Sequence, residues 1–298
     1  MDLWHRIGRF FKIANLGTLI FFALNLMMIL LVFGTSVEGQ ENVTYLVMTY
    51  FISVIIAVST LGELFLVVMI GAKPIRRKDY QIKIMPLLEL VLKKTKENSP
   101  YTVNKVNLTM IHDETPNAFA VGRKTICITD ALLNLSDDDI LGILAHEVGH
   151  LAYGHSIVQL IIGGGNVFIW VAIFLIKIAC WTITAILGLF AIRSRRLISG
   201  VLLAGIASLS SILIWLWTKF CLLFLRWSMR QNEFVADEFA YNIGFGNQLA
   251  KVIEESPKYI SIENGFLKAL CSIHPDSDER IARLQEMGVI YNAYISRY

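Results

Sequence analysis

The stretch from His146 to His150 constrains this chain most, because it reads H-E-V-G-H and fits the pattern H-E-x-x-H. If the stretch is helical, its two histidines lie one turn apart on one face, where neutral imidazoles can hold one tetrahedral Zn²⁺. Glu147 directly follows the first histidine, so its carboxylate would lie beside the metal without binding it. Glu147 is therefore a candidate base that accepts a proton from water.

The residues around the motif predict that it is helical. Ser136 is a good N-cap, and Asp139 three residues later completes a capping box. Asp137 and Asp138 add negative charge to the first turn, where the helix dipole favours it. An apolar stripe follows: Ile140, Leu141, Ile143, Leu144, Val148 and Leu151. A capped, apolar helix makes the metal site a stronger prediction than the five-letter pattern alone, which also occurs by chance on surface helices.

The composition indicates a membrane protein. Of the 298 residues, 55% are hydrophobic and 17% are charged, whereas soluble domains carry about 25% charged residues. The mean hydropathy is +0.57. The net charge of +3 is small, and no basic run is interleaved with aromatic residues, so nucleic acid is not an expected partner. The four cysteines are scattered and form no C-x-x-C pair, which favours a reducing environment over a disulfide scaffold.

Two apolar segments predict an N-terminal transmembrane hairpin. Residues 13–37 carry no charge and exceed the about 20 residues that span a bilayer, and the run is too long for a signal peptide. Residues 43–72 form a second predicted span, which Glu63 interrupts. A carboxyl in a span is costly, so we expect Glu63 near the interface or against other helices, with a role in substrate passage as the alternative. Basic residues on both outer flanks place those flanks in the cytoplasm.

The segment 73–155 has the pattern of soluble α+β structure. Pro86 suits the start of a helix, which would end before Pro100. The predicted elements are a helix over 87–97 and strands over 106–112, 116–121 and 124–129, the last two joined by a turn at Gly122.

A catalytic zinc usually has three protein ligands and one open position for water, so a third ligand is needed. The pattern H-E-x-x-H-x-x-G-x-x-H would require glycine at 153 and histidine at 156, but the chain has Tyr153 and His155. We therefore expect His155 beside the site or at an interface. Glu233 is the other candidate, and Asp237 one helical turn later is suited to orient a ligating histidine. The alternative is a surface Glu–Asp pair on an amphipathic helix.

These motifs together resemble the HtpX-type membrane metallopeptidases, relatives of the CAAX prenyl proteases. Residues 233–237, E-F-V-A-D, match the family pattern E-[FY]-x-A-D, which follows H-E-x-x-H after two spans. Residues 116–120, P-N-A-F-A, resemble the family's edge strand beside the zinc. His274 and Arg280, with their neighbours, resemble its H-P-x-x-x-x-R-I element. The resemblance extends over nearly the whole chain.

The resemblance implies a zinc-dependent endopeptidase whose substrates are polypeptides bound as an added strand. In the peptide hydrolysis that the resemblance implies, His274 donates a hydrogen bond to the developing oxyanion, with Arg280 beside it. The alternative role for Arg280 is a salt bridge that holds the site together. The implied residues are Glu147, His274 and Arg280 in catalysis, His146, His150 and Glu233 as zinc ligands, Asp237 behind a ligand, and Asn117, Ala118, Phe119 and Ala120 in substrate binding.

Convergence of the ligands also constrains topology. The chain between His150 and Glu233 must cross the membrane an even number of times, so two spans are expected there. The basic turn at 193–196 would then lie outside, against the positive-inside rule, which is statistical. The predicted parts are a transmembrane hairpin over 1–72, the first part of the catalytic domain over 73–155, a second transmembrane hairpin over 156–225, and the second part of the catalytic domain over 226–298.

The predicted fold is α+β but mostly α-helical, an integral membrane protein with four transmembrane helices and a zincin-like catalytic domain with a small β-sheet. We expect it in the cell inner membrane, with the catalytic domain and both termini cytoplasmic, and we expect it to act in membrane protein quality control. A prenyl-protein processing protease and an inactive scaffold that keeps the fold are the alternatives. The sequence sets neither the substrate nor the oligomeric state.

Overall fold

The structure is a computed structural model. It describes residues 15–33, 40–101, 103, 105–160, 174–175, 178–179, 181–183, 185–186, 197–255 and 276–291. The chain divides into two compact units. The first, here called the sheet unit, comprises Met1–Leu16, Ile56–Ile162 and Trp227–Tyr298, and the second, the helical unit, comprises Gly17–Ile55 and Gly163–Arg226. The chain is mostly helical with one small mixed sheet, which confirms that part of the predicted fold.

Three long apolar helices belong wholly or partly to the helical unit. They are α2 (Leu16–Phe33), α3 (Gln40–Val58) and the first part of α9 (Leu197–Asn242). Over the residues that the structure describes, no single helix is long and apolar enough to cross a bilayer. The bent pair of α3 and α4 (Thr60–Met69) passes that test jointly. The predicted span 13–37 is described over residues 15–33, which include α2, whereas most of the segment 156–192 lies outside the described residues.

The predicted span over 43–72 is not one continuous helix, because the chain breaks at Ser59 between α3 and α4. The hydroxyl of Ser59 accepts the N–H of Leu61 at 3.2 Å, and it also donates to the carbonyl of Ile56 at 2.6 Å. The same side chain thus terminates one helix and caps the next. Sequence reasoning missed the break because Ser59 stands in an otherwise apolar run.

Large apolar side chains remain exposed along α3, α4 and α9. They include Tyr45, Met48, Phe51, Ile52, Ile55, Ile56, Leu61, Leu64, Phe65, Val68, Met69, Leu209, Ile212, Leu213, Trp215, Leu216, Phe220 and Leu223. Soluble monomers rarely expose contiguous apolar surface on this scale, so these helices need an apolar environment or a partner.

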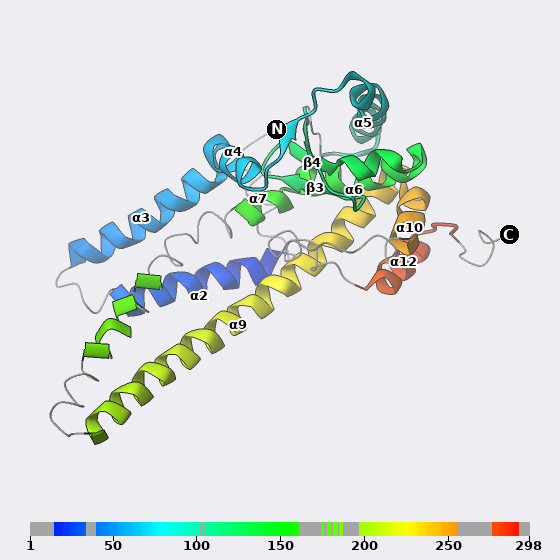
Figure 1. The fold of residues 1–298 in the computed structure, drawn as a ribbon. Helices are drawn as coiled ribbons and strands as arrows, with labels where there is room; N and C mark the ends of the chain where they lie inside the picture. The colour runs from blue at the N-terminus through cyan, green and yellow to red at the C-terminus, as the bar shows by residue number, and fades with distance from the viewer. Residues whose placement is uncertain are drawn as a thin grey trace. The chain divides into compact units, whose positions relative to one another are not determined.

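The four strands follow the order β1-β2-β4-β3 in the sheet, and Figure 1 labels the neighbouring strands β3 and β4. They are β1 (Lys73–Pro74), β2 (Asn107–Ile111), β3 (Ala118–Val121) and β4 (Thr125–Thr129). β2 and β4 are parallel, whereas β1–β2 and β3–β4 are antiparallel. Gly122, at φ +63°, begins the tight turn from β3 to β4, as predicted. Among the described residues, β3 is consequently an edge strand with one side unpaired.

Helix α5 (Lys78–Asn98) corrects the expectation that Pro86 starts a helix, because the helix begins eight residues earlier and contains the proline. Its buried residues are Ile84, Leu88, Val91 and Thr95, an apolar stripe at helical spacing that runs past Pro86. Burial of this continuous stripe outweighs the hydrogen bond that a proline removes inside a helix.

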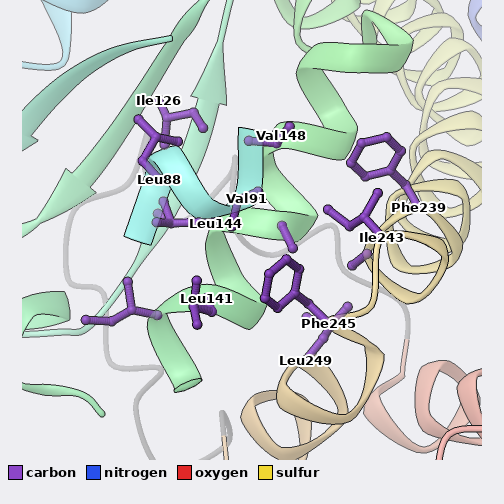
Figure 2. Packing of buried hydrophobic residues seen from close by; sticks show 14 of the residues in the cluster. Leu88, Val91, Ile126, Leu141, Leu144, Val148, Phe239, Ile243, Phe245 and Leu249 are labelled. Atoms are coloured by element: carbon purple, nitrogen blue, oxygen red, sulfur yellow. The ribbon is translucent and has the colours of Figure 1, made fainter. Parts of the chain in front are cut away.

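Helix α6 (Asp137–Tyr153) lies at the centre of the sheet unit and packs against α5, α10 (Gly246–Glu255) and β3. Leu144 and Val148 of α6 are fully buried, and they join residues from α5, β4, α9 and α10 in one cluster (Figure 2). The described part of the unit is completed by the 3-10 helix η2 (Asp130–Asn134), by α7 (His155–Leu160) and by α12 (Ser277–Glu286).

The predicted cap of α6 is present. Ser136 Oγ accepts the N–H of Asp139 at 3.2 Å and donates to its carboxylate at 2.6 Å. The second oxygen of that carboxylate accepts from Lys251 of α10 at 2.7 Å, so the cap also ties the two helices together.

Helices α6 and α10 are in close contact at Gly142. A Cβ added at Gly142 would lie 2.7 Å from the backbone nitrogen of Leu249 and 2.8 Å from the carbonyl carbon of Gln248. Neither backbone atom can swing away as a flexible side chain could. The close contact therefore requires glycine at this position.

We expect Gly142→Ala to lower the free energy of unfolding by about 1–3 kcal/mol, because overpacking forces the two helices apart. The sign is informative, since alanine is favoured over glycine inside a helix by about 1 kcal/mol. The measurement is denaturant unfolding of the full chain in detergent. Glu89→Ala, at an exposed mid-helix position of α5, should stay within about 0.5 kcal/mol of wild type. A Gly142→Ala protein as stable as wild type would refute the close approach.

Candidate active site

Helix α6 carries the two histidines of the H-E-x-x-H motif on one face. The Nε2 atoms of His146 and His150 lie 3.1 Å apart, and their rings meet edge to face with centroids 4.7 Å apart. His146 is buried, and His150 is partly buried. The helix turn thus directs both nitrogens toward one point, as the spacing predicts.

Glu233 of α9 reaches the same point from a segment 83 residues further along the chain. One of its carboxylate oxygens lies 3.3 Å from Nε2 of His146, and the other lies 3.3 Å from Nε2 of His150. In the described part of the chain these residues form a group whose ligand atoms all lie within 4.8 Å of one another. Two imidazoles and one carboxylate are a donor set that suits Zn²⁺ with a fourth position open. The residues therefore fit the predicted metal.

The two motif helices meet at their small residues. A Cβ on Gly149 would lie 3.3 Å from Cα of Ala236 and 3.1 Å from Cδ1 of Phe239. Gly149 sits just before His150 in the first motif, and Ala236 just before Asp237 in the second. Gly149 has no side chain and Ala236 has only a methyl group, so α6 and α9 can approach closely enough for the ligands to meet.

A buried chain of charges lies behind His146. The Nδ1 atom of His146 is 2.8 Å from Oδ1 of Asp237. Arg280 of α12 donates to both oxygens of that carboxylate, at 2.8 and 2.6 Å. Nη1 of Arg280 also lies 4.0 Å from Glu233. Asp237 therefore orients the ring of His146 from behind, as the one-turn spacing from Glu233 predicts, and Arg280 fixes Asp237 in turn.

This arrangement shifts the pKa of each member. Burial alone would raise the pKa of Asp237, but the charge and hydrogen bonds of Arg280 lower it to about 2. Burial would lower the pKa of His146, but the hydrogen bonds and charges of Asp237 and Glu233 raise it to about 10. A raised pKa favours the protonated imidazole, so a metal that binds through Nε2 competes with a proton and its affinity depends on pH.

His155 lies behind the second histidine. Its Nδ1 atom is 3.1 Å from Nδ1 of His150, on the opposite side of that ring from Glu233. The ring of His155 is buried and stacks on Tyr153, with centroids 5.6 Å apart. His155 thus contacts a ligand and does not join the ligand group. Gly154 makes this possible, because at φ +77° it ends α6 and turns the chain back.

Glu147 points from α6 toward the edge strand β3. The backbone N–H of Ala120 donates to its Oε2 atom at 2.7 Å. Glu147 is buried, at 6% exposure, and it is not part of the ligand group. No sequence pattern indicates this contact, because the two residues are 27 positions apart. The hydrogen bond fixes the carboxylate of the candidate base.

The unpaired side of β3 is defined by the strand register. The N–H of Thr129 donates to the carbonyl of Asn117 at 2.9 Å, and the N–H of Asn117 donates to the hydroxyl of Thr129 at 2.8 Å. Because antiparallel pairing alternates, Phe119 also faces β4, and Ala118 and Ala120 direct their main-chain groups to the free edge. Because the N–H of Ala120 is already bonded to Glu147, the groups placed to pair with an added strand are the main-chain groups of Ala118 and the carbonyl of Ala120, two of the four residues predicted to bind substrate.

His274 lies outside the described residues, so its predicted role stays a prediction. Arg280 lies within the site, and two of its nitrogens donate to Asp237. That geometry favours the salt-bridge role for Arg280 over direct contact with a substrate.

Two helices that bring a His-His-Glu group together beside a buried glutamate and a free strand edge define a site of the metallopeptidase type. Residues 86–288 match peptidase family M48, and the chain belongs to this family. This agrees with the resemblance that the motifs predicted.

Three relatives have similar sequences. The chain is 27% identical to the protease HtpX homolog of Methanocaldococcus jannaschii, over 61% of this chain and 69% of the relative. It is 29% identical to the homolog of Tropheryma whipplei, over 60% and 65%, and 28% identical to that of Pyrococcus furiosus, over 63% and 71%. The crystal structure of S. mikatae Ste24p matches with a TM-score of 0.46 at 17% identity, over 87% of this chain and 62% of that one.

We expect purified protein to hold about one zinc ion per chain and His150→Ala to lose it, because two remaining ligands hold zinc poorly. Elemental analysis after gel filtration measures the metal without reference to activity. His112→Ala is the matched control, since His112 is an exposed histidine that pairs with Asp130 outside the ligand group. Full zinc content in His150→Ala would contradict the ligand assignment.

Proposed function

We propose that this chain is a zinc-dependent endopeptidase of the membrane. The observation that carries the proposal is the meeting of His146, His150 and Glu233 beside Glu147 and the free edge of β3. Membership of a peptidase family supports it, as do relatives that bear the name protease HtpX homolog.

His146, His150 and Glu233 would hold the zinc. When bound there, zinc supplies a Lewis acid that polarises the scissile carbonyl and lowers the pKa of water. Asp237 keeps the Nδ1 side of His146 occupied, so that Nε2 faces the metal position. His155 does the same for His150. Both ligating rings thus have a second contact that fixes their orientation.

Glu147 moves the proton. Its carboxylate accepts a proton from the attacking water and passes that proton to the leaving amine, as a general base and then a general acid. The N–H of Ala120 holds the carboxylate by one oxygen, Oε2, which leaves Oε1 to face the water. We further propose that His274 donates to the oxyanion, and that Arg280 acts through Asp237.

The substrate would bind in extended form on the free edge of β3. Ala118 presents its main-chain groups there and Ala120 its carbonyl, because the N–H of Ala120 is bonded to Glu147. Main-chain pairing depends little on the sequence of a substrate. Broad specificity follows, which suits misfolded or damaged membrane proteins as the substrate class.

The exposed apolar helices support a membrane location. α4 carries Leu61, Leu64, Phe65, Val68 and Met69 at its surface. A helix with this surface is stable in lipid and costly in water. The basic run directly after α4, K-P-I-R-R-K over residues 73–78, then marks the cytoplasmic boundary.

We expect Glu147→Gln to keep its zinc and to lower kcat for an unfolded protein such as casein by about 10²–10⁴-fold, the range for general acid–base groups. Glutamine keeps the oxygen that accepts from Ala120 but cannot take a proton. Glu89→Gln, at an exposed position of α5, is the control and should retain full turnover. Near-wild-type kcat in Glu147→Gln would refute the mechanism.

We expect four spans, with both termini and residues 79–155 and 226–298 in the cytoplasm. In a cysteine-free background, Ser194→Cys in the turn between the last two predicted spans should react with an impermeant thiol reagent outside intact cells. Asn134→Cys, exposed in the sheet unit, should react only after lysis. The reverse pattern would show an inverted orientation. Protection of both until lysis would show a hairpin that never crosses.

A further inference from the structure

Glu63 is a buried carboxylate in the apolar helix α4, and the proposed chemistry does not use it. It is 4% exposed, and it is the one charged residue in the sequence T-L-G-E-L-F-L-V-V-M of α4. Its neighbours Leu61, Leu64 and Phe65 are all more than half exposed. The acid therefore lies on the inner face of α4, opposite the apolar surface.

Glu63 accepts two hydrogen bonds from the turn between β3 and β4. The hydroxyl of Thr125 donates to Oε1 at 2.5 Å, and the backbone N–H of Arg123 donates to Oε2 at 3.1 Å. These donors stand 60 and 62 residues later in the chain. Each carboxylate oxygen thus has a partner from the same turn, which offsets the cost of burying the charge.

The peptide unit between Gly122 and Arg123 is held at both ends. Its N–H donates to Glu63, and its carbonyl accepts from the hydroxyl of Ser156 at 2.6 Å. Ser156 is fully enclosed, at 1% exposure, and belongs to α7. One peptide group is therefore fixed between α4 on one side and α7 on the other.

Close packing accompanies these hydrogen bonds. A Cβ on Gly122 would lie 2.7 Å from Cγ of Glu63, and Gly122 already has φ +63°. Glycine is thus required twice, for the backbone conformation and for the approach of the acid. This close packing indicates that the contact between Glu63 and the turn is specific.

The turn that Glu63 contacts is connected to two parts of the site, the edge strand β3 and the segment that carries His155. Ala120, two residues before Gly122, donates to Glu147, and its strand β3 supplies the free edge. On the other side, Ser156 directly follows His155, which contacts His150. A shift of the turn would therefore displace the edge strand and the partner of a ligating histidine together.

We propose that Glu63 is a positioning residue that fixes the β3–β4 turn to the apolar helix α4 and thereby sets the substrate edge of β3. The inference rests on the proposed function for the identity of that edge as the substrate site. The contact itself, and its effect on the turn, do not depend on it.

The test uses the full chain in detergent and two variants of different kind. Glu63→Gln keeps the size of the side chain but presents an amide N–H₂ to one of the two donors, so one hydrogen bond is lost. Thr125→Val removes the hydroxyl at constant shape and leaves the carboxylate in place. Glu89→Gln is the matched control on exposed α5. Zinc content reports whether the metal group survives.

We expect hydrogen exchange of the segment 118–125 to rise by about tenfold in Glu63→Gln, because a bonded amide of the turn opens more readily. KM for casein should rise several-fold, with a smaller change in kcat and with zinc unchanged. Thr125→Val should change the exchange rate and KM in the same direction, and Glu89→Gln should change neither.

Wild-type exchange and wild-type KM in both variants would overturn the proposal. Faster exchange with unchanged KM would overturn the link between the turn and the substrate edge. If exchange rises in both variants while the wild-type protein hydrolyses no peptide, the proposed function fails and the positioning of the turn by Glu63 is supported.

Discussion

The close approach of α6 and α9 is the constraint on which the site depends. Three ligand atoms can meet at one metal only if two helices from distant parts of the chain come nearly into backbone contact. Gly149 and Ala236 permit this, since a side chain on Gly149 would press against Cα of Ala236. Each motif thus contains ligands and also the small residue that lets the other motif reach them. The small residues within H-E-V-G-H and E-F-V-A-D therefore help to set the geometry of the ligand group.

Burying this many charges together is costly unless each is paired. His146, Glu233, Asp237 and Arg280 are all buried. The bidentate contact between Arg280 and Asp237 satisfies both charges and leaves Asp237 fully ionised behind His146. Replacement of such a pair by apolar residues is often neutral for stability, which suggests that its value here lies in orienting a ligand. The third element, α12, takes part in the site through this one side chain of Arg280.

Short-range patterns predicted much of this architecture. The cap at Ser136 and the strands around Gly122 follow from residue type and spacing. The meeting of His146 with Glu233 was expected from the family resemblance of their two motifs. Pro86 was misleading because local propensity favoured a helix start, whereas the buried stripe from Ile84 to Thr95 continued the helix through it. Ser59 was missed as a break because its capping hydrogen bonds are visible only in the folded backbone.

Contacts between distant segments that carry no motif could not be predicted from the sequence. The N–H of Ala120 is a backbone donor and has no sequence signal, so its bond to Glu147 is apparent only in the fold. Glu63 was expected near the interface or against other helices, but its partners are Arg123 and Thr125 in the sheet. His155 was expected beside the site, yet only the turn at Gly154 shows which face of His150 it contacts.

The shortness of β3 has a consequence for what the proposed enzyme can attack. The strand is four residues long, and two of its residues face the free edge. A segment that pairs there has to be extended, with its own main-chain groups free. Helical and sheet segments of a folded protein have those groups already bonded, and a span within lipid keeps them bonded most strongly. The site would therefore discriminate between substrates by their conformational state. A folded membrane protein would not bind, and the same protein would become a substrate once one of its segments unfolds.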